Sequence, residues 1–262
     1  MTLSLLAFFV LFPSPSAPAA EKMNTSLVAG EHSFFVDDDV VALAAPLADP
    51  LEPLNRVFFQ FNDSFYFCIL KPASQMYGSL VPDMLRLGVR NFFSNLLSPV
   101  RIVNNVLQWK WKNVELESVR FFVNSTIGLL GFMDPAEEEM NIPPQPEDFG
   151  QTLGVLGFGP GIYIHWPFLG ASSVRDSFGY WVDTFFSPLW YLYRSDPGVW
   201  LEATALYQVN NTTFTGQDYE DFKEISFDPY LAVRDAYEQS RRTSILDRHS
   251  PDSPAVGQGF VK

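Results

Sequence analysis

One long segment of the chain carries no charged side chain and is rich in glycine and proline. Between Asp148 and Arg175 the sequence contains no Lys, Arg, Asp or Glu. An uncharged stretch of this length is typical of a transmembrane helix, but glycine and proline at this density break helices. We therefore predict irregular backbone over most of the segment, with a short strand at residues 161–166. Such backbone is tolerated at membrane depth only where protein covers it or where it lines a cavity. A buried glycine loop in a soluble domain fits the composition equally well.

The composition indicates a protein with too few charges for an ordinary soluble surface. Charged residues make up 18% of the 262-residue chain, below the usual quarter, and the chain contains 25 Phe. The net charge of −13 argues against nucleic acid as a partner and against a polybasic lipid-binding patch. A single cysteine, Cys68, excludes an internal disulfide and forms no metal cluster, so neither a metal nor another cofactor is expected.

The two ends of the chain differ from its middle. Residues 1–20 are apolar and end in Ala17-Pro18-Ala19, which favours a cleaved signal peptide over a structural helix and predicts export. Residues 21–48 read as an acidic flexible arm, and the Pro/Gly-rich residues 249–262 as a disordered tail. We expect one helical domain at residues 49–248.

Helix starts in this domain are marked by Asp or Ser followed by Pro. The side-chain oxygen caps a free N–H, and proline at the first helical position has no donor to leave unpaired. The pattern occurs at Asp49-Pro50, Ser98-Pro99, Asp134-Pro135, Ser187-Pro188, Asp196-Pro197 and Asp228-Pro229. Glu52 and Glu137 follow three residues after Asp49 and Asp134, as in a capping box. Because strand-like alternation is scarce, we predict a mainly α fold: a compact helical bundle with one glycine-rich loop or short hairpin.

Four predicted helices, at residues 49–65, 81–98, 99–108 and 115–134, carry narrow polar stripes and wide apolar faces. Each could be an ordinary amphipathic helix with its polar side in water, and Gly128 and Gly131 could serve close helix packing. Four such helices together favour apolar faces toward lipid and polar stripes toward a shared centre. The residues predicted to line this polar centre are Arg56, Gln60, Arg86, Arg90, Glu117, Arg120 and Asn124. Charges at membrane depth need partners, for which Asp83, Glu117 and phospholipid headgroups are candidates.

Trp109-Lys110-Trp111-Lys112 follows the third of these helices. Indole rings prefer the headgroup zone of a bilayer, and lysine side chains extend toward water. Trp109 and Trp111 therefore form a predicted interfacial anchor, with a surface turn as the alternative.

Catalytic motifs are missing from the sequence. It contains no G-x-S-x-G, H-E-x-x-H or phosphate-binding loop. His165 has no acid near it in the sequence, so a packed or interfacial role fits it better than that of a base. We predict that the protein is not an enzyme.

Several long motifs resemble the MlaA/VacJ family of Gram-negative outer-membrane proteins and occur in the family's order. They are DPLEPLNR at residues 49–56, FN at 61–62, RFFVNSTIGLLGFMD at 120–134, DFGQTLGVLGFGPGIY at 148–163 with a following P-x-x-G-x-S-x-x-RD, and DPYLAVRDAY at 228–237. Ile162 and Ala171 stand where the family commonly has proline. Family members usually carry a lipobox cysteine after the signal peptide. No such cysteine is seen here, and Cys68 is too far along the chain. The family's lipid anchor is therefore not expected in this protein.

The resemblance implies a ring-shaped helical protein embedded mainly in the inner leaflet of the outer membrane, on its periplasmic side. It implies a central passage through which mislocalised outer-leaflet phospholipids leave for a periplasmic MlaC-like carrier and an inner-membrane ABC transporter, which maintains lipid asymmetry. Association with a trimeric outer-membrane porin is also implied.

The uncharged segment is the predicted gate of such a passage. Its glycines are expected to supply backbone conformations that other residues resist, which would let the loop act as a movable wall. The predicted gating residues are Gly154, Gly157, Phe158, Gly159, Gly161, Tyr163 and His165. A rigid plug is the alternative. For the whole protein, a soluble periplasmic lipid-binding carrier and a structural envelope protein without a lipid path remain open, as do lipid preference and transport direction.

Overall fold

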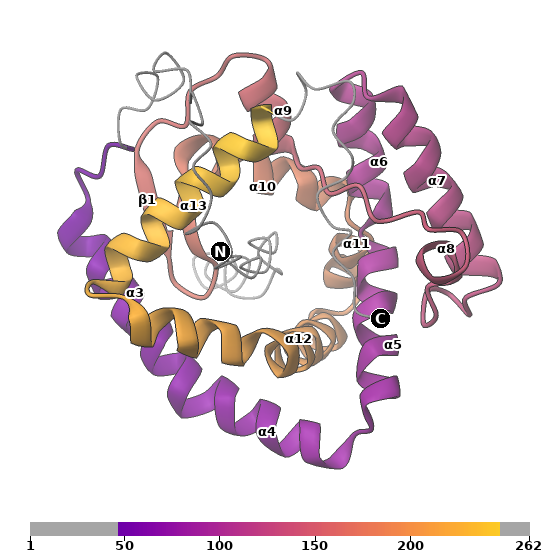
Figure 1. The fold of residues 1–262 in the computed structure, drawn as a ribbon, viewed down its shortest axis with the longest axis horizontal. Coiled ribbons are helices and arrows are strands. Elements are labelled where there is room, and N and C mark those ends of the chain that lie inside the picture. The colour runs from indigo at the N-terminus through magenta and orange to yellow at the C-terminus, as the bar shows by residue number, and fades with distance from the viewer. Residues whose placement is uncertain (1–46, 247–262) are drawn as a thin grey trace, which may run out of the picture.

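The computed structural model describes residues 47–246, so the predicted signal peptide, the arm up to residue 46 and the predicted tail lie outside the described residues. In chain order the elements are α3 (Glu52–Phe65), the π-helix η2 (Tyr66–Leu70), α4 (Lys71–Leu80), α5 (Asp83–Leu96), α6 (Ser98–Leu107), α7 (Trp111–Thr126), α8 (Pro135–Glu138), α9 (Phe149–Val155), β1 (Tyr163–Trp166), β2 (Gly170–Ser173), α10 (Val174–Phe186), α11 (Pro188–Ser195), α12 (Pro197–Ile225) and α13 (Pro229–Leu246). Figure 1 shows these elements arranged in a ring. The predicted mainly helical, ring-like bundle with a short hairpin is confirmed.

A continuous helical rod forms one side of the rim. α3, η2 and α4 follow one another without a break, and α12 packs beside α4 on its inner side (Figure 1). α13 begins near α3, at one end of the rod, and runs toward α9, where it contacts α9 and β2 (Figure 1). The ring is therefore closed by contacts between elements that are distant in the sequence.

The buried side chains of the described residues are mostly polar. Buried apolar side chains form two small clusters, one of Phe93, Leu189 and Trp200 and one of Leu47, Tyr163 and Tyr230. Buried polar and charged side chains outnumber the apolar ones, while many Leu, Ile, Val, Met and Phe side chains are exposed. This distribution is the reverse of that in a typical soluble domain.

Three of the predicted Asp-Pro helix starts are capped as expected. Asp134, Asp196 and Asp228 each accept hydrogen bonds from backbone N–H groups of the helix that follows. The prediction for Asp49 is wrong. Its carboxylate instead accepts from the side chain of Asn55 in α3 and from the hydroxyl of Tyr230, so it joins α3 to α13 and does not cap a backbone N–H.

The uncharged segment contains more regular structure than predicted. Residues 149–155 form the helix α9, whose N-terminus is capped by Asp148 at the backbone N–H of Gln151. β1 pairs with β2 as an antiparallel hairpin, with Tyr163 opposite Ser173 and Trp166 opposite Gly170. The predicted strand is confirmed, but irregular backbone is limited to residues 156–162 and 167–169. Glycine is tolerated in α9 because capping and tertiary packing offset its low helix propensity.

The fourth predicted helix also ends early. α7 stops at Thr126, and the chain then turns through Leu129, Leu130 and Gly131, all with positive φ. A side chain at Gly131 would collide with Asn95 of α5. Gly131 therefore permits close packing against α5, which was the alternative role proposed for it from the sequence.

Candidate functional site

The hairpin is held on one edge by Asn55, a buried residue of α3. Asn55 donates from Nδ2 to the carbonyl oxygen of Tyr163 at 3.2 Å. Its Oδ1 accepts from the backbone N–H of His165 at 2.9 Å. A side-chain amide thus satisfies the backbone groups that an edge strand would otherwise leave unpaired.

Asn62, seven residues further along α3, repeats this arrangement. It donates to the carbonyl oxygen of Trp166 at 2.9 Å and accepts from the backbone N–H of Phe168 at 2.7 Å. Residues seven apart lie on the same face of a helix. α3 therefore takes the place of a third strand beside β1.

His165 is 3% exposed, and Asn62 determines which tautomer its imidazole adopts. Because Oδ1 of Asn62 accepts from Phe168, its Nδ2 faces Nε2 of His165 at 3.2 Å. An amide nitrogen only donates, so Nε2 is the acceptor and the neutral ring carries its proton on Nδ1, 3.0 Å from the hydroxyl oxygen of Tyr163. Burial lowers the pKa of His165 to about 4, so the ring is neutral at pH 7.

The base of the uncharged segment is clamped by Arg241 of α13. Its guanidinium donates to both carboxylate oxygens of Asp148 at 2.6 and 2.9 Å, and to Asp176 at 2.6 Å. Asp176 also accepts from Arg175 and from the hydroxyl of Tyr237. Burial alone would raise the pKa of Asp176, but the two arginines outweigh it and lower this pKa to about 2. Both ends of the segment are thus tied to one helix by ionised groups.

The tip of the segment, residues 156–162, is its exposed part. Leu156 and Phe158 are 61% and 59% exposed. Gly157 and Gly161 adopt φ values of +91° and +76°, which side chains resist.

Two of the predicted gating glycines do not match the expected backbone role. Gly154 lies inside α9, where a side chain would collide with Ile245. Gly159 has a negative φ and open space around it, so no special conformation requires glycine there.

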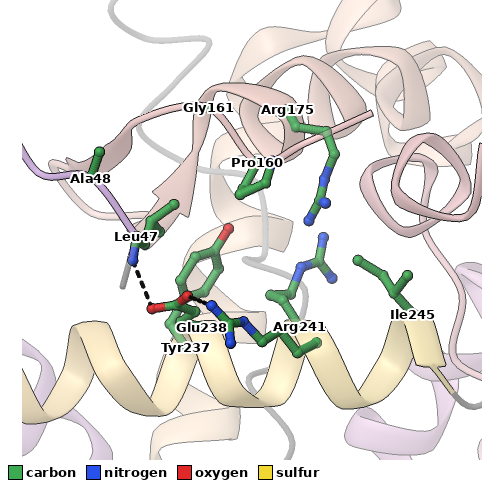
Figure 2. A pocket seen from close by; sticks show the side chains of 10 residues that line it. Leu47, Ala48, Pro160, Gly161, Arg175, Tyr237, Glu238, Arg241 and Ile245 are labelled. Carbon is green, nitrogen blue, oxygen red and sulfur yellow. Dashed lines mark hydrogen bonds and ion pairs between the residues drawn. The ribbon is translucent and has the colours of Figure 1, made fainter. Parts of the chain in front are cut away.

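A pocket of about 330 Å³ lies between the tip and α13 (Figure 2). Its lining residues are Leu47, Ala48, Pro160, Gly161, Arg175, Tyr237, Glu238, Arg241, Arg242 and Ile245. Figure 2 shows the guanidinium groups of Arg175 and Arg241 pointing toward each other, while Glu238 bonds to the N–H of Leu47 and to Arg242. The guanidinium groups lie beside the apolar side chains of Leu47, Pro160 and Ile245, and both are already bonded to aspartates.

Three residues predicted to line a polar passage are engaged with protein groups instead. Glu117 is fully buried and pairs with Arg101 at 2.6 Å. Arg120 is 3% exposed and pairs with Asp134 at 2.6 Å, and Asn124 donates to the same carboxylate. These side chains fasten α7 to its neighbours, and a role for them in lipid passage stays a prediction.

The other predicted polar residues lie on α3 and α5. Arg56 pairs with Asp228 at 2.9 Å, which joins α3 to α13, and Gln60 is exposed. Arg86 and Arg90 of α5 both lie over the ring of Phe214, at 5.6 and 5.0 Å from its centre. Of the partners proposed from the sequence, Asp83 pairs with Arg86 and Glu117 with Arg101.

The rod of α3, η2 and α4 separates polar from apolar side chains. Toward α12, Asp63 pairs with Lys223 at 2.7 Å, and both Tyr66 and Lys71 bond to Glu220. The rod also exposes Gln60 and Gln75, but most of its exposed large side chains are apolar: Leu54, Val57, Phe61, Phe67, Ile69, Met76 and Leu80. Trp109 and Trp111, the predicted anchor, are likewise 68% and 58% exposed.

Among the described residues, no helix combines the length and the apolar character needed to cross a bilayer.

The sequence-based prediction missed Asn55, Asn62, Arg241, Asp148 and Asp176. A signal for each was present. The two asparagines stand seven residues apart in the DPLEPLNR and FN motifs, and the two aspartates flank the uncharged run. A basic residue about one turn after the DPYLAVRDAY motif is a weaker signal, because surface helices commonly carry arginine.

Comparison with known proteins gives consistent matches over the described domain. The profile of a family described as "MlaA lipoprotein" matches residues 47–244. The Escherichia coli (strain K12) protein named "Intermembrane phospholipid transport system lipoprotein MlaA" is 35% identical over 202 residues, which cover 73% of this chain and 76% of that protein. The protein of the same name from Haemophilus influenzae is 29% identical over 206 residues, covering 76% of this chain and 80% of that protein. A solved structure, from work on the "structural basis for maintenance of bacterial outer membrane lipid asymmetry", matches with a TM-score of 0.65 and 30% identity and covers 76% of this chain and 99% of that one.

Proposed function

The chain belongs to the MlaA lipoprotein family, and from this membership we propose that it is a phospholipid translocation channel of the outer membrane. It takes mislocalised phospholipids from the outer leaflet and releases them on the periplasmic side for retrograde transport. Lipid asymmetry is thereby maintained. The names of its relatives, which refer to intermembrane phospholipid transport, support this class of function.

The observation that carries the proposal is the distribution of side chains on the rod α3–η2–α4. Many of its apolar side chains are exposed, while Asp63, Tyr66 and Lys71 are paired with α12. A soluble carrier would instead bury its apolar surface. A protein that lies in a lipid leaflet presents apolar groups outward and keeps its polar groups paired within.

The hairpin segment is the proposed gate. Its base is tied by Arg241 and its strand edge by Asn55 and Asn62, whereas its tip is exposed. This division allows the tip to move while the hairpin stays in place. The arginine-containing pocket behind the tip would then receive the anionic headgroup of a passing lipid.

We propose two partners for this channel. A periplasmic MlaC-like carrier accepts the released phospholipid, and a trimeric porin supports the protein in the outer membrane. A photo-cross-linking residue in place of the exposed Phe158 would test for both in living cells.

The test of the function is complementation of a Gram-negative strain that lacks its own MlaA. Outer-leaflet phospholipid is quantified by labelling amine headgroups on intact cells. We expect the deletion to raise this signal and the full chain to return it to the level of the parent strain. Normal accumulation of the chain in the outer membrane without a fall in the signal would overturn the proposal.

Fractionation separates the alternatives. Release of the protein with bound phospholipid by osmotic shock would identify a soluble lipid carrier. Retention in the membrane without co-purifying phospholipid and without complementation would identify a structural envelope protein.

A further inference from the structure

A second pocket, of about 280 Å³, lies between the rod and α12, apart from the hairpin site. It is lined by Tyr66, Lys71, Ser74, Gln75, Gly78, Arg86, Thr212, Thr213, Gly216, Gln217 and Glu220. Its charged members are two cations, Lys71 and Arg86, and one anion, Glu220. The lining residues therefore carry a formal charge of +1, before the exposed carboxylate of Asp83, which pairs with Arg86, is counted.

The π-helix η2 brings two of these residues to the same partner. Tyr66 donates to Glu220 at 2.9 Å, and Lys71, five residues later, donates to the other oxygen of that carboxylate at 2.7 Å. On an α-helix, residues five apart are separated by about 140° around the axis. The wider π-turn reduces this angle, and such turns occur frequently at functional sites.

Arg86 of α5 lines the pocket and has hydrogen-bond donors that are not all used. Its side chain is 14% exposed, and its Nε is buried without a hydrogen-bond partner among residues 47–246. One terminal nitrogen pairs with Asp83, whose side chain is 86% exposed. Gly78 leaves room for the other, since a Cβ at this position would lie 3.6 Å from it. Unpaired guanidinium N–H groups are costly, and the terminal nitrogen beside the pocket-lining Gly78 is the one placed to meet an acceptor there.

We propose that this pocket binds the phosphate group of a phosphate ester, with Arg86 and Lys71 as the donors. The hydroxyl groups of Ser74, Thr212 and Thr213 already donate to helix carbonyl oxygens, so the two cations carry the recognition. Glu220 orients Lys71 and opposes a multiply charged anion. A singly charged phosphodiester, the form in a phospholipid headgroup, matches the +1 pocket better than doubly charged inorganic phosphate does. The phosphate site itself is independent of the proposed function. Only the identification of a phospholipid as the source of the phosphate group rests on that function.

Calorimetry on the purified full chain in detergent tests the site. Glycerophosphoethanolamine and inorganic phosphate are the two probes, and mass spectrometry counts the phospholipid that remains after purification. Arg86→Gln removes the charged donor. Gly78→Ala places a methyl group in the pocket and raises helix propensity, so it is expected to fold at least as well as the wild type. Arg194→Gln, at an exposed position on α11, is the charge-matched control.

We expect Arg86→Gln to weaken binding of glycerophosphoethanolamine about tenfold or more, since a charge-assisted hydrogen bond is lost. Gly78→Ala should also weaken it, and Arg194→Gln should bind like the wild type. If Arg86→Gln and Gly78→Ala lose binding of inorganic phosphate, the site is supported and free phosphate is one of its ligands. Loss of retained phospholipid would support a headgroup.

Equal affinity of the wild type, Arg86→Gln and Gly78→Ala for both probes would overturn the site. The complementation assay stays separate from this result. A chain that clears outer-leaflet phospholipid but binds the probes independently of Arg86 contradicts this site alone. A chain that binds them through Arg86 but fails to complement contradicts the channel.

Discussion

At the scale of single residues, the buried imidazole of His165 makes the stability of the folded state depend on pH. Its Nε2 accepts from Asn62, and protonation would turn this acceptor into a donor facing another donor. Burial lowers the pKa from the ordinary 6.5 to about 4. A lowered histidine pKa favours the folded state above the unfolded pKa, and this contribution is lost as the pH falls toward 4.

The first prediction follows from this shift. The free energy of unfolding of the wild type should fall by about 3 kcal/mol more than that of His165→Gln between pH 7 and about pH 4. Denaturant unfolding in detergent at several pH values measures it. A wild-type-to-variant difference that is constant with pH would contradict the neutral, buried histidine.

The second prediction concerns Arg120. Arg120→Leu should lower the free energy of unfolding by about 3–5 kcal/mol, because it removes the cationic partner of the Asp134 carboxylate. Adding Asp134→Asn should recover part of this loss. Adding Glu117→Gln, which removes the partner of Arg101, should not. Recovery with Glu117→Gln and none with Asp134→Asn would contradict the observed pairing.

At the scale of elements, side chains of α3 bond to the backbone along β1, as a neighbouring strand would do with its own backbone. Asn62→Ala should speed hydrogen exchange at the backbone N–H of Phe168 while sparing that of His165, and Asn55→Ala should do the reverse. Each lost bond corresponds to about 1 kcal/mol and thus about fivefold faster exchange. Gln60→Ala, at an exposed position of the same helix, is the control. Equal exchange of both amides in all three variants would show that the asparagines do not hold the hairpin.

Motion of the tip relative to α13 is the fourth prediction. Pro160 and Ile245 line the same pocket, so cysteines at the two positions in a Cys68→Ser background can be joined by a short reversible cross-linker. We expect cross-linking to raise outer-leaflet phospholipid to the level of the deletion strain, and reduction of the linker to restore transport. Full transport with the tip tethered would support the rigid plug.

At the scale of the molecule, residues 47–246 expose many large apolar side chains, which predicts how the protein fractionates. Embedding 1,000 Å² of apolar surface contributes on the order of 25 kcal/mol before ordering costs, so the full chain should remain with membranes through osmotic shock and high salt. Replacing Leu80, Met84 and Leu85, all more than half exposed, with Gln should raise the released fraction about tenfold or more. Gln217→Ala, at an exposed polar position on α12, is the control. Equal retention of the triple variant would show that these side chains do not face lipid.

The sequence by itself determined the features that depend on near neighbours. Helix starts at Asp134, Asp196 and Asp228 need only a side-chain oxygen and an N–H two or three residues away. The strand at 163–166 and the scarcity of charge on the outer faces are likewise local properties. These local properties were sufficient to predict a mainly helical bundle with exposed apolar side chains.

Only the tertiary structure decided which polar groups meet. Arg241 reaches Asp148 across 93 residues, Asn55 reaches His165 across 110, and Arg120 pairs with Asp134 although Glu117 is nearer in the sequence. Several partners of similar chemistry were available to each group, and pairing energy depends on distance and burial in space. The closure of the ring sets those distances, because it places α3 and α13 on either side of the hairpin.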